Sequence, residues 1–108
     1  MATKSPTTRS LELLRSRGYT VAVVERSSSF NGVFRRHDLW NIGDLLAIRR
    51  DEIMLVQVTS APNVSSRIKK IKESEYIGAI RESGMLVFVH GWGKKVNGRY
   101  ECREVDLS

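Results

Sequence analysis

Hydrophobic positions gather in short runs that alternate with polar, turn-forming segments. Four such runs cover residues 19–25, 45–48, 53–58 and 85–92, and aliphatic side chains dominate them. Short apolar runs of this kind between turn residues predict β-strands. The three later runs are almost continuously apolar, so we expect these strands to be buried on both faces.

Two segments carry the signals of helices. The first begins with Ser5-Pro6, a helix cap followed by a proline at the first helical position, and it closes at Gly18. The second covers residues 65–83 and ends at Gly84, and four of its apolar residues fall within one broad arc at about 100° per residue. We therefore predict one helix near the start of the chain and one over 65–83.

Turn signals order the remaining segments. The charged "RRDE" between the second and third apolar runs predicts an antiparallel hairpin, and Asn97-Gly98 predicts another before an edge strand, "RYECREV". Residues 26–32 read as a flexible loop with a turn at Asn31-Gly32, and residues 33–43 could be extended or irregular. The predicted fold class is α/β: a single domain over residues 1–108, with a mixed central sheet and flanking helices.

Polar residues in the predicted hairpin point to chemistry. Asp44 opens one strand after a glycine, and Gln57 lies near the end of the partner strand, so the hairpin brings both to the same end of the sheet. Gln57 and Thr59 are two residues apart, which directs their side chains to one face. A carboxylate, an amide oxygen and a hydroxyl around one point would suit Mg²⁺ or Mn²⁺. The competing interpretation is a strand-entry aspartate and a core glutamine, each with local hydrogen bonds.

The text "DLLAI…VQVTS", with "SRGYTVAVVE" before it and "GMLVFVHGW" after it, resembles the PD-(D/E)xK nuclease superfamily. It is most similar to the archaeal-type Holliday junction resolvase branch, whose motif opens one strand with an aspartate and places acid-x-lysine on the next. The resemblance covers most of residues 7–92. It implies an αβββαβ restriction-endonuclease-like core plus a C-terminal strand, and a metal-dependent DNA endonuclease that uses Mg²⁺ or Mn²⁺. It also implies branched DNA as the substrate and a homodimer.

The resemblance assigns roles position by position. It makes Asp44 a metal ligand, puts Gln57 in place of the second acid and Thr59 in place of the lysine, and gives the metal the backbone carbonyl of Val58. Gly43 replaces the family's proline, and the resolvase glutamate on the first helix has no clear counterpart. A neutral amide binds a divalent cation more weakly than a carboxylate, and threonine cannot offer a positive charge to the scissile phosphate.

Substitutes for the missing groups are available nearby. Lys69 or Lys72 could reach the site from the edge of the second helix, or both could extend into solvent. Asp38 could add a second carboxylate or remain a solvated loop acid. The alternative to an active nuclease is therefore a protein of the same fold that has lost cleavage and binds DNA or a protein partner.

The net charge of +6 favours an anionic partner, and its distribution matters more than its sum. If the sheet is ordered as the resemblance implies, two basic clusters, "FRRHD" and "SRIKKIK", flank the predicted site. Their candidates for binding nucleic-acid phosphates are Arg35, Arg36, Ser65, Arg67, Lys69 and Lys70. A third cluster, "GKKVNGR", follows the strand over 85–92. Trp40 and Trp92 could stack on bases or pack in the protein.

Other function classes find little support. A single cysteine and the separated His37 and His90 predict neither a disulfide nor a zinc site. No apolar run approaches the roughly 20 residues needed to cross a bilayer, so we predict no membrane partner. The first ten residues lack the apolar core of a signal peptide, so we expect a cytoplasmic protein.

Overall fold

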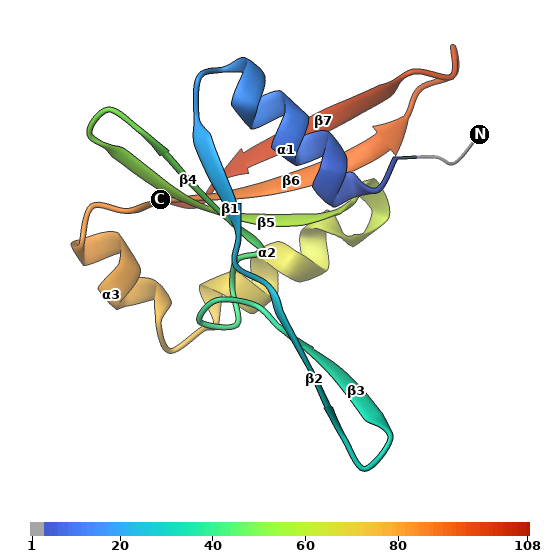
Figure 1. Ribbon diagram of the computed structural model, residues 1–108. Coiled ribbons are helices and arrows are strands. Elements are labelled where there is room, and N and C mark those ends of the chain that lie inside the picture. The colour runs from blue at the N-terminus through green and yellow to red at the C-terminus, as the bar shows by residue number, and fades with distance from the viewer. Residues whose placement is uncertain (1–3) are drawn as a thin grey trace.

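A five-stranded mixed sheet forms the centre of the protein (Figure 1) in a computed structural model that describes residues 4–108. The strands lie in the order β1-β4-β5-β6-β7. Their bounds are β1 Thr20–Val23, β4 Leu45–Arg49, β5 Glu52–Ser60, β6 Leu86–Lys94 and β7 Tyr100–Asp106. The predicted α/β class with a mixed central sheet is confirmed.

The pairing of the strands follows the turn signals in the sequence. β4 and β5 form the predicted antiparallel hairpin, with Leu45 opposite Val56 and the turn at "RRDE". β6 and β7 form the second antiparallel hairpin, which places β7 at an edge of the sheet. β5 and β6 are parallel, so the chain must cross over between them, and the helical segment does this.

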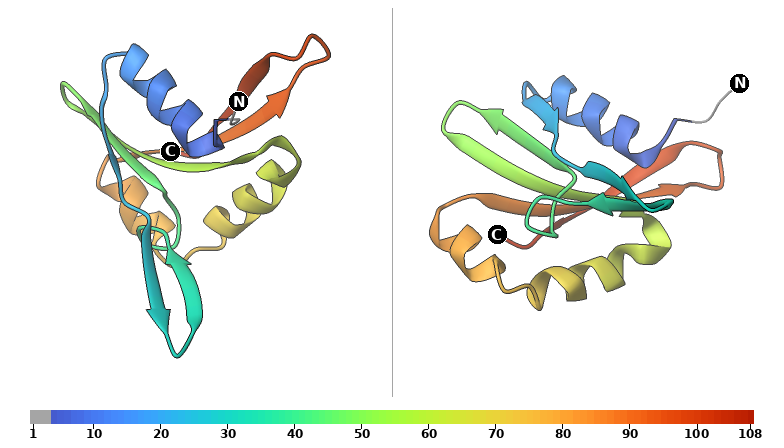
Figure 2. Two further views of the ribbon diagram at one scale, coloured as in Figure 1. Left: turned by 45° about the vertical axis from the view of Figure 1, so that its right-hand side comes forward. Right: turned by 60° about the horizontal axis from the view of Figure 1, so that its bottom comes forward.

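Helices cover both faces of the sheet (Figure 2). α1 Pro6–Ser16 lies on one face, and α2 Val64–Lys72 and α3 Ile77–Glu82 lie on the other, with a short 3₁₀ turn, η1 Ala61–Asn63, before α2. The predicted cap is present, since the Oγ of Ser5 accepts the amide hydrogen of Thr8 at 3.1 Å.

The single helix predicted over 65–83 is wrong, because the chain breaks between α2 and α3. Ile71 and Ile77 are both buried, and six residues turn a continuous helix by about 600°, so they could not face the sheet together. The break between the two helices lets both side chains face the sheet. The Oγ of Ser74 accepts the amide hydrogen of Tyr76 at 3.1 Å, a local bond that competes with helix continuation.

The sheet has a buried core on each side. Leu55 and Val89 pack with Ile71 against α2 and α3, while Val56 packs with Leu14 against α1. The predicted burial of β5 on both faces is therefore confirmed over most of its length.

The prediction of a loop over 26–32 is wrong. β2 Arg26–Phe30 and β3 Val33–His37 form an antiparallel hairpin that projects from the body of the protein (Figure 1). The turn signal itself is confirmed, since Asn31 and Gly32 both have positive φ, as a tight hairpin turn needs. Every residue of both strands is exposed, so no apolar periodicity marks the hairpin in the sequence. Among the described helices, none is long and apolar enough to span a bilayer.

Candidate metal-binding site

Asp44 and Gln57 meet at the end of the β4–β5 hairpin, on the face covered by α2. The side-chain nitrogen of Gln57 donates to Oδ2 of Asp44 at 2.6 Å, and the backbone N–H of Val58 donates to the same oxygen at 2.8 Å. Both side chains are buried, with 6% of Asp44 and 2% of Gln57 exposed. The two polar side chains therefore converge, as the hairpin and the alternation of side chains predict.

The backbone of Asp44 ties the neighbouring strands together. Its N–H donates to the carbonyl of Val56 at 2.8 Å, and its carbonyl accepts from Val24 at 2.9 Å and from Glu25 at 3.3 Å. These bonds hold Glu25, two residues after the end of β1, beside Asp44. A strand residue directs its N–H and its C=O to the same side, so the carbonyl of Val58 also faces the start of β4.

A tight turn brings a further carboxylate to the site. Trp40 and Asn41 both adopt positive φ, and Leu39 pairs with Gly43 across the turn, with an N–O distance of 2.8 Å. A Cβ atom on Gly43 would overlap the side chain of Leu55, so only glycine lets this turn lie so close to β5. The turn places Asp38 over the pocket.

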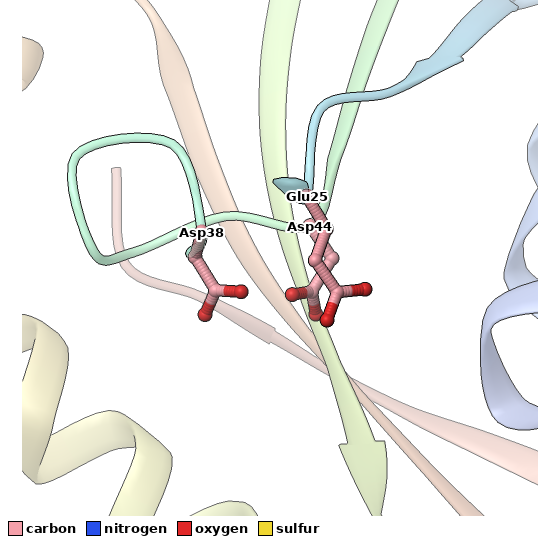
Figure 3. A group of neighbouring side chains, drawn as sticks. All are labelled: Glu25, Asp38 and Asp44. Atoms are coloured by element: carbon pink, nitrogen blue, oxygen red, sulfur yellow. The ribbon is translucent and has the colours of Figure 1, made fainter. Parts of the chain in front are cut away.

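Three carboxylates converge as a result (Figure 3). Oxygen atoms of Glu25, Asp38 and Asp44 all lie within 4.8 Å of one another. The sequence suggested Asp38 as a possible second carboxylate but gave no role to Glu25. The signal for Glu25 is its place as the last residue of the predicted strand over 19–25, a polar residue after an apolar run.

The pocket around these acids has a volume of about 310 Å³ and contains two polar atoms without a partner. Oε1 of Gln57 and Nε of Arg67 are both buried, and neither makes a hydrogen bond with any described residue. A buried polar atom that stays unpaired costs about 1–3 kcal/mol, so such atoms usually mark a place for water, an ion or a ligand. Both atoms belong to residues that line the pocket, which makes the pocket the candidate place for such a group.

Burial raises the pKa of Asp44 to about 7, and a hydrogen bond with the carboxyl group of Asp38 adds to the rise. The bonds from Val58 and Gln57 act in the opposite direction. Burial beside another carboxyl group opposes the ionisation of Asp44, because like charges in a partly dry pocket repel each other. A divalent cation would remove that conflict by taking the place of the proton.

Basic side chains surround the acids. Nζ of Lys70 lies 3.6 Å from Oδ2 of Asp38, and a guanidinium nitrogen of Arg36 lies 3.8 Å from Glu25. Arg67 lines the pocket as well, three residues before Lys70 on the same side of α2. The predicted phosphate-binding residues Arg36, Arg67 and Lys70 are therefore brought to the acids.

Other predicted site residues lie elsewhere. Lys69, Lys72 and Ser65 are exposed and do not line the pocket, whereas Arg67 and Lys70 on another side of α2 do. The reason is that the pocket lies beyond the start of β4, beside the helix rather than beneath it. Thr59 is buried next to Gly91 of β6 and does not line the pocket, and Arg35 is exposed on the hairpin.

A second polar cluster lies on the α1 face and resembles a catalytic triad. Oγ of Ser10 lies 2.9 Å from Nδ1 of His90, whose Nε2 lies 3.4 Å from Glu104. The indole N–H of Trp92 donates to Oγ of Ser10 at 2.8 Å, and Arg17 donates to Glu104 at 2.9 Å. Ser10 and His90 are completely buried, so no substrate reaches them, and burial lowers the pKa of His90 to about 4. This cluster is structural.

Another hollow, with a volume of about 600 Å³, lies at the other end of β4. Its lining includes Arg17, Arg49 and Arg50 and no acidic residue, so it has no ligands for a cation. The acidic pocket is the better candidate for chemistry.

No family model, no curated protein and no solved structure matches this chain.

Proposed function

We propose that the protein is a metal-dependent DNA endonuclease, with its active site in the pocket that contains Asp44. The observation that carries the proposal is the unpaired, buried Oε1 of Gln57 beside three converging carboxylates. An amide oxygen and several carboxylate oxygens form the ligand set that Mg²⁺ or Mn²⁺ prefers. The resemblance to PD-(D/E)xK nucleases supports the same assignment for Asp44 and Gln57.

The residues that fit the metal are Glu25, Asp38, Asp44 and Gln57, with the carbonyl of Val58 on the same side of β5. A bound Mg²⁺ or Mn²⁺ supplies a Lewis acid that lowers the pKa of a coordinated water and offsets the charge of a phosphate. Within the protein, Gln57 and the N–H of Val58 hold the Asp44 carboxylate in one orientation. A bound cation would favour the ionised form of Asp44, whose carboxylate would be one of its ligands.

Arg67 and Lys70 supply the positive charge that Thr59 cannot. Nε of Arg67 is an unpaired donor in the pocket, and a guanidinium group suits a phosphate oxygen pair. Lys70 lies against Asp38, close enough to turn toward a phosphate once that carboxylate binds a cation. We assign phosphate binding to these two residues and to Arg36, in place of the expected Lys69 and Lys72.

Cleavage of labelled DNA tests the proposal. The wild type should cut a four-way junction, the substrate that the resemblance favours, with Mg²⁺ or Mn²⁺ and not with EDTA. Asp44→Ala should abolish cutting, whereas Thr59→Ser, in a residue outside the pocket, should cut at close to the wild-type rate. Failure to cut junction, forked and linear DNA with either metal would overturn the proposal.

A second candidate function is binding without cleavage. Two observations favour it. Position 59 holds a threonine where the resembled family has a lysine, and Lys70 already forms an ion pair with Asp38. Such a protein would bind DNA or a protein partner and would keep DNA binding in Asp44→Ala. Metal-dependent cutting that requires Asp44 excludes this candidate. The resemblance also implies a homodimer, which sedimentation equilibrium would detect.

A further inference from the structure

The β2–β3 hairpin is the most exposed part of the described chain. Its strands pair only with each other, and the hairpin projects away from both helical layers (Figures 1 and 2). An isolated two-stranded hairpin is marginally stable in water, so an arm of this kind usually acts through what it binds. The hairpin is therefore a candidate interaction surface.

The chemistry of the hairpin is basic along its length and apolar near its tip. Residues 26–37 contain three arginines and no acidic residue. Near the turn, Phe30 is 78% exposed, Phe34 is 62% exposed and Val33 is 52% exposed. A cluster of exposed apolar side chains bordered by charge is typical of a binding site.

The two phenylalanines lie on opposite faces of the ribbon. Phe30 is opposite Val33 and Phe34 is opposite Ser29, and neighbouring pairs in a hairpin direct their side chains to alternate faces. The arginines divide in the same way, with Arg35 on the face of Phe30 and Arg36 on the face of Phe34. Each face of the arm thus offers one aromatic ring near the tip and a guanidinium group behind it.

The base of the hairpin is part of the candidate active site. The last pair of the hairpin joins Arg26 to His37, and the next residues outward are Glu25 and Asp38, two of the three converging carboxylates. Arg36 lines the same pocket. A ligand held along the hairpin would therefore lead directly into the acidic pocket.

We propose that the β2–β3 hairpin is a nucleic-acid-binding arm that selects DNA with unstacked bases for the adjacent site. The arginines bind phosphates, and the phenylalanine rings stack on exposed base faces near the tip. This inference rests on the proposed nuclease function, because it names the substrate of that site. A second copy of the chain fits the arm less well, since two hairpins that carry three arginines each and no acid would repel.

The tip distinguishes unstacked from continuous DNA. A phenylalanine has no polar atom to contact base edges in a groove, whereas it stacks on the face of any base that has lost its neighbour. Base faces are accessible at forks, junctions and single strands, and they are covered in a continuous duplex. Phosphates are accessible in both, so the arginines alone would give no preference.

Fluorescence anisotropy with two DNA probes in EDTA tests the arm apart from cleavage. The probes are a fork with two unpaired arms and a continuous duplex of the same length. The variants are F30S/F34S for the tip and R26Q/R35Q for the stem. Their matched controls are V96S and R99Q, in the exposed turn between β6 and β7, where Val96 is fully exposed. Circular dichroism and the melting temperature confirm that each variant folds.

The wild type should bind the fork at least about tenfold more tightly than the duplex, since stacking on each base favours binding by roughly that factor or more. F30S/F34S should lose this preference and bind the fork only as tightly as the wild type binds the duplex. R26Q/R35Q should weaken both complexes and reduce the salt dependence of binding by about two released ions. V96S and R99Q should stay within about twofold of the wild type.

Three results would overturn the inference: no preference of the wild type for the fork, wild-type fork binding by F30S/F34S, or equal losses in the control variants. A wild-type dimer that dissociates in F30S/F34S without a change in DNA binding would assign the tip to self-association instead. If the wild type cleaves DNA and F30S/F34S cleaves it equally well, the proposal for the arm is wrong and the proposed nuclease function stands. If fork binding depends on the arm but no metal supports cleavage, the proposed nuclease function is wrong and the proposal for the arm stands.

Discussion

The sheet carries a buried polar cluster on each face, and the two clusters differ in how their charged groups are arranged. Each cluster holds buried polar atoms without a hydrogen-bond partner among the described residues, and on the α1 face this atom is Nε2 of His90. On the α1 face, Trp92, Ser10, His90 and Glu104 form a chain of polar contacts that Arg17 completes at the surface. On the α2 face, three carboxylates approach one another, and an amide oxygen and a guanidinium nitrogen lack partners. Similar residue types thus form a chain of polar contacts on one face and a group of converging carboxylates on the other.

The difference lies in charge and in access. In the α1 cluster, burial keeps His90 neutral, and the Glu104 charge is balanced by Arg17 near the surface. In the α2 cluster, burial raises the pKa of Asp44, and the neighbouring carboxyl group of Asp38 adds to the rise. Lys70 and Arg36 lie beside the other two acids, so Asp44 is the carboxyl group without a cationic partner among the described residues. A raised pKa of this kind in a pocket is typical of a functional site.

The largest effect should come from Asp44→Asn. The cleavage rate should fall at least about 100-fold, since even residues that only support a metal ligand change activity by 10–100-fold. The free energy of unfolding without metal should stay equal or increase, because the substitution removes a buried acid beside Asp38. Cleavage assays and urea unfolding measure the two quantities. A strong loss of stability would mean that Asp44 is structural, like His90.

Ser10→Ala should show the reverse pattern. It leaves the indole N–H of Trp92 and Nδ1 of His90 without their shared partner, so the free energy of unfolding should fall by about 1–3 kcal/mol. Cleavage at a temperature where the variant is folded should match the wild type within about twofold. Loss of cleavage without loss of stability would give the α1 cluster a direct role in the reaction. Ser16→Ala, in an exposed position of the same helix, is the matched control.

Gln57→Glu should strengthen metal binding by about tenfold, because it adds a formal charge to the ligand set. Titration of Mn²⁺ followed by the melting temperature measures the affinity. Asn41→Asp, which adds an acid elsewhere in the lining of the same pocket, separates a ligand effect from a general charge effect. Unchanged or weaker affinity in Gln57→Glu would show that Gln57 is not a ligand.

The smallest effect should be a pair of opposing pH dependences. The pKa of His90 falls from 6.5 to about 4 on folding, so the folded state binds fewer protons between these values and this contribution to stability rises with pH. The pKa of Asp44 rises from 3.8 to about 7, so its contribution falls as pH rises through nearly the same window. The two contributions offset each other in the wild type.

Urea unfolding between about pH 5 and 6.5 separates these contributions, each limited to about 1.4 kcal/mol per pH unit. Asp44→Asn should steepen the rise of stability with pH, and His90→Gln should turn it into a fall. Parallel curves for Asp44→Asn and the wild type would contradict the raised pKa of Asp44 in the folded state.

The candidate site was partly predictable from the sequence. Asp44 and Gln57 are polar residues at strand positions with a fixed spacing, and the "RRDE" turn sets the register that brings them together. Glu25 and Asp38 lie on either side of a hairpin that has no apolar periodicity, so only the Asn31-Gly32 turn and the place of Glu25 at the end of a strand indicate that they meet. Arg67 was identified as basic, but not as a group with an unpaired, buried nitrogen.

The sequence alone determined the order of the main strands, the first helix and the β4–β5 turn, because these depend on local hydrophobic periodicity and turn residues. Tertiary structure alone decided that the chain breaks between Ile71 and Ile77, because both must reach one core. It also decided which side of α2 meets the acids, and which of two buried polar clusters borders an open pocket. Burial and pairing depend on the positions of distant segments, and a pattern along the chain does not contain them.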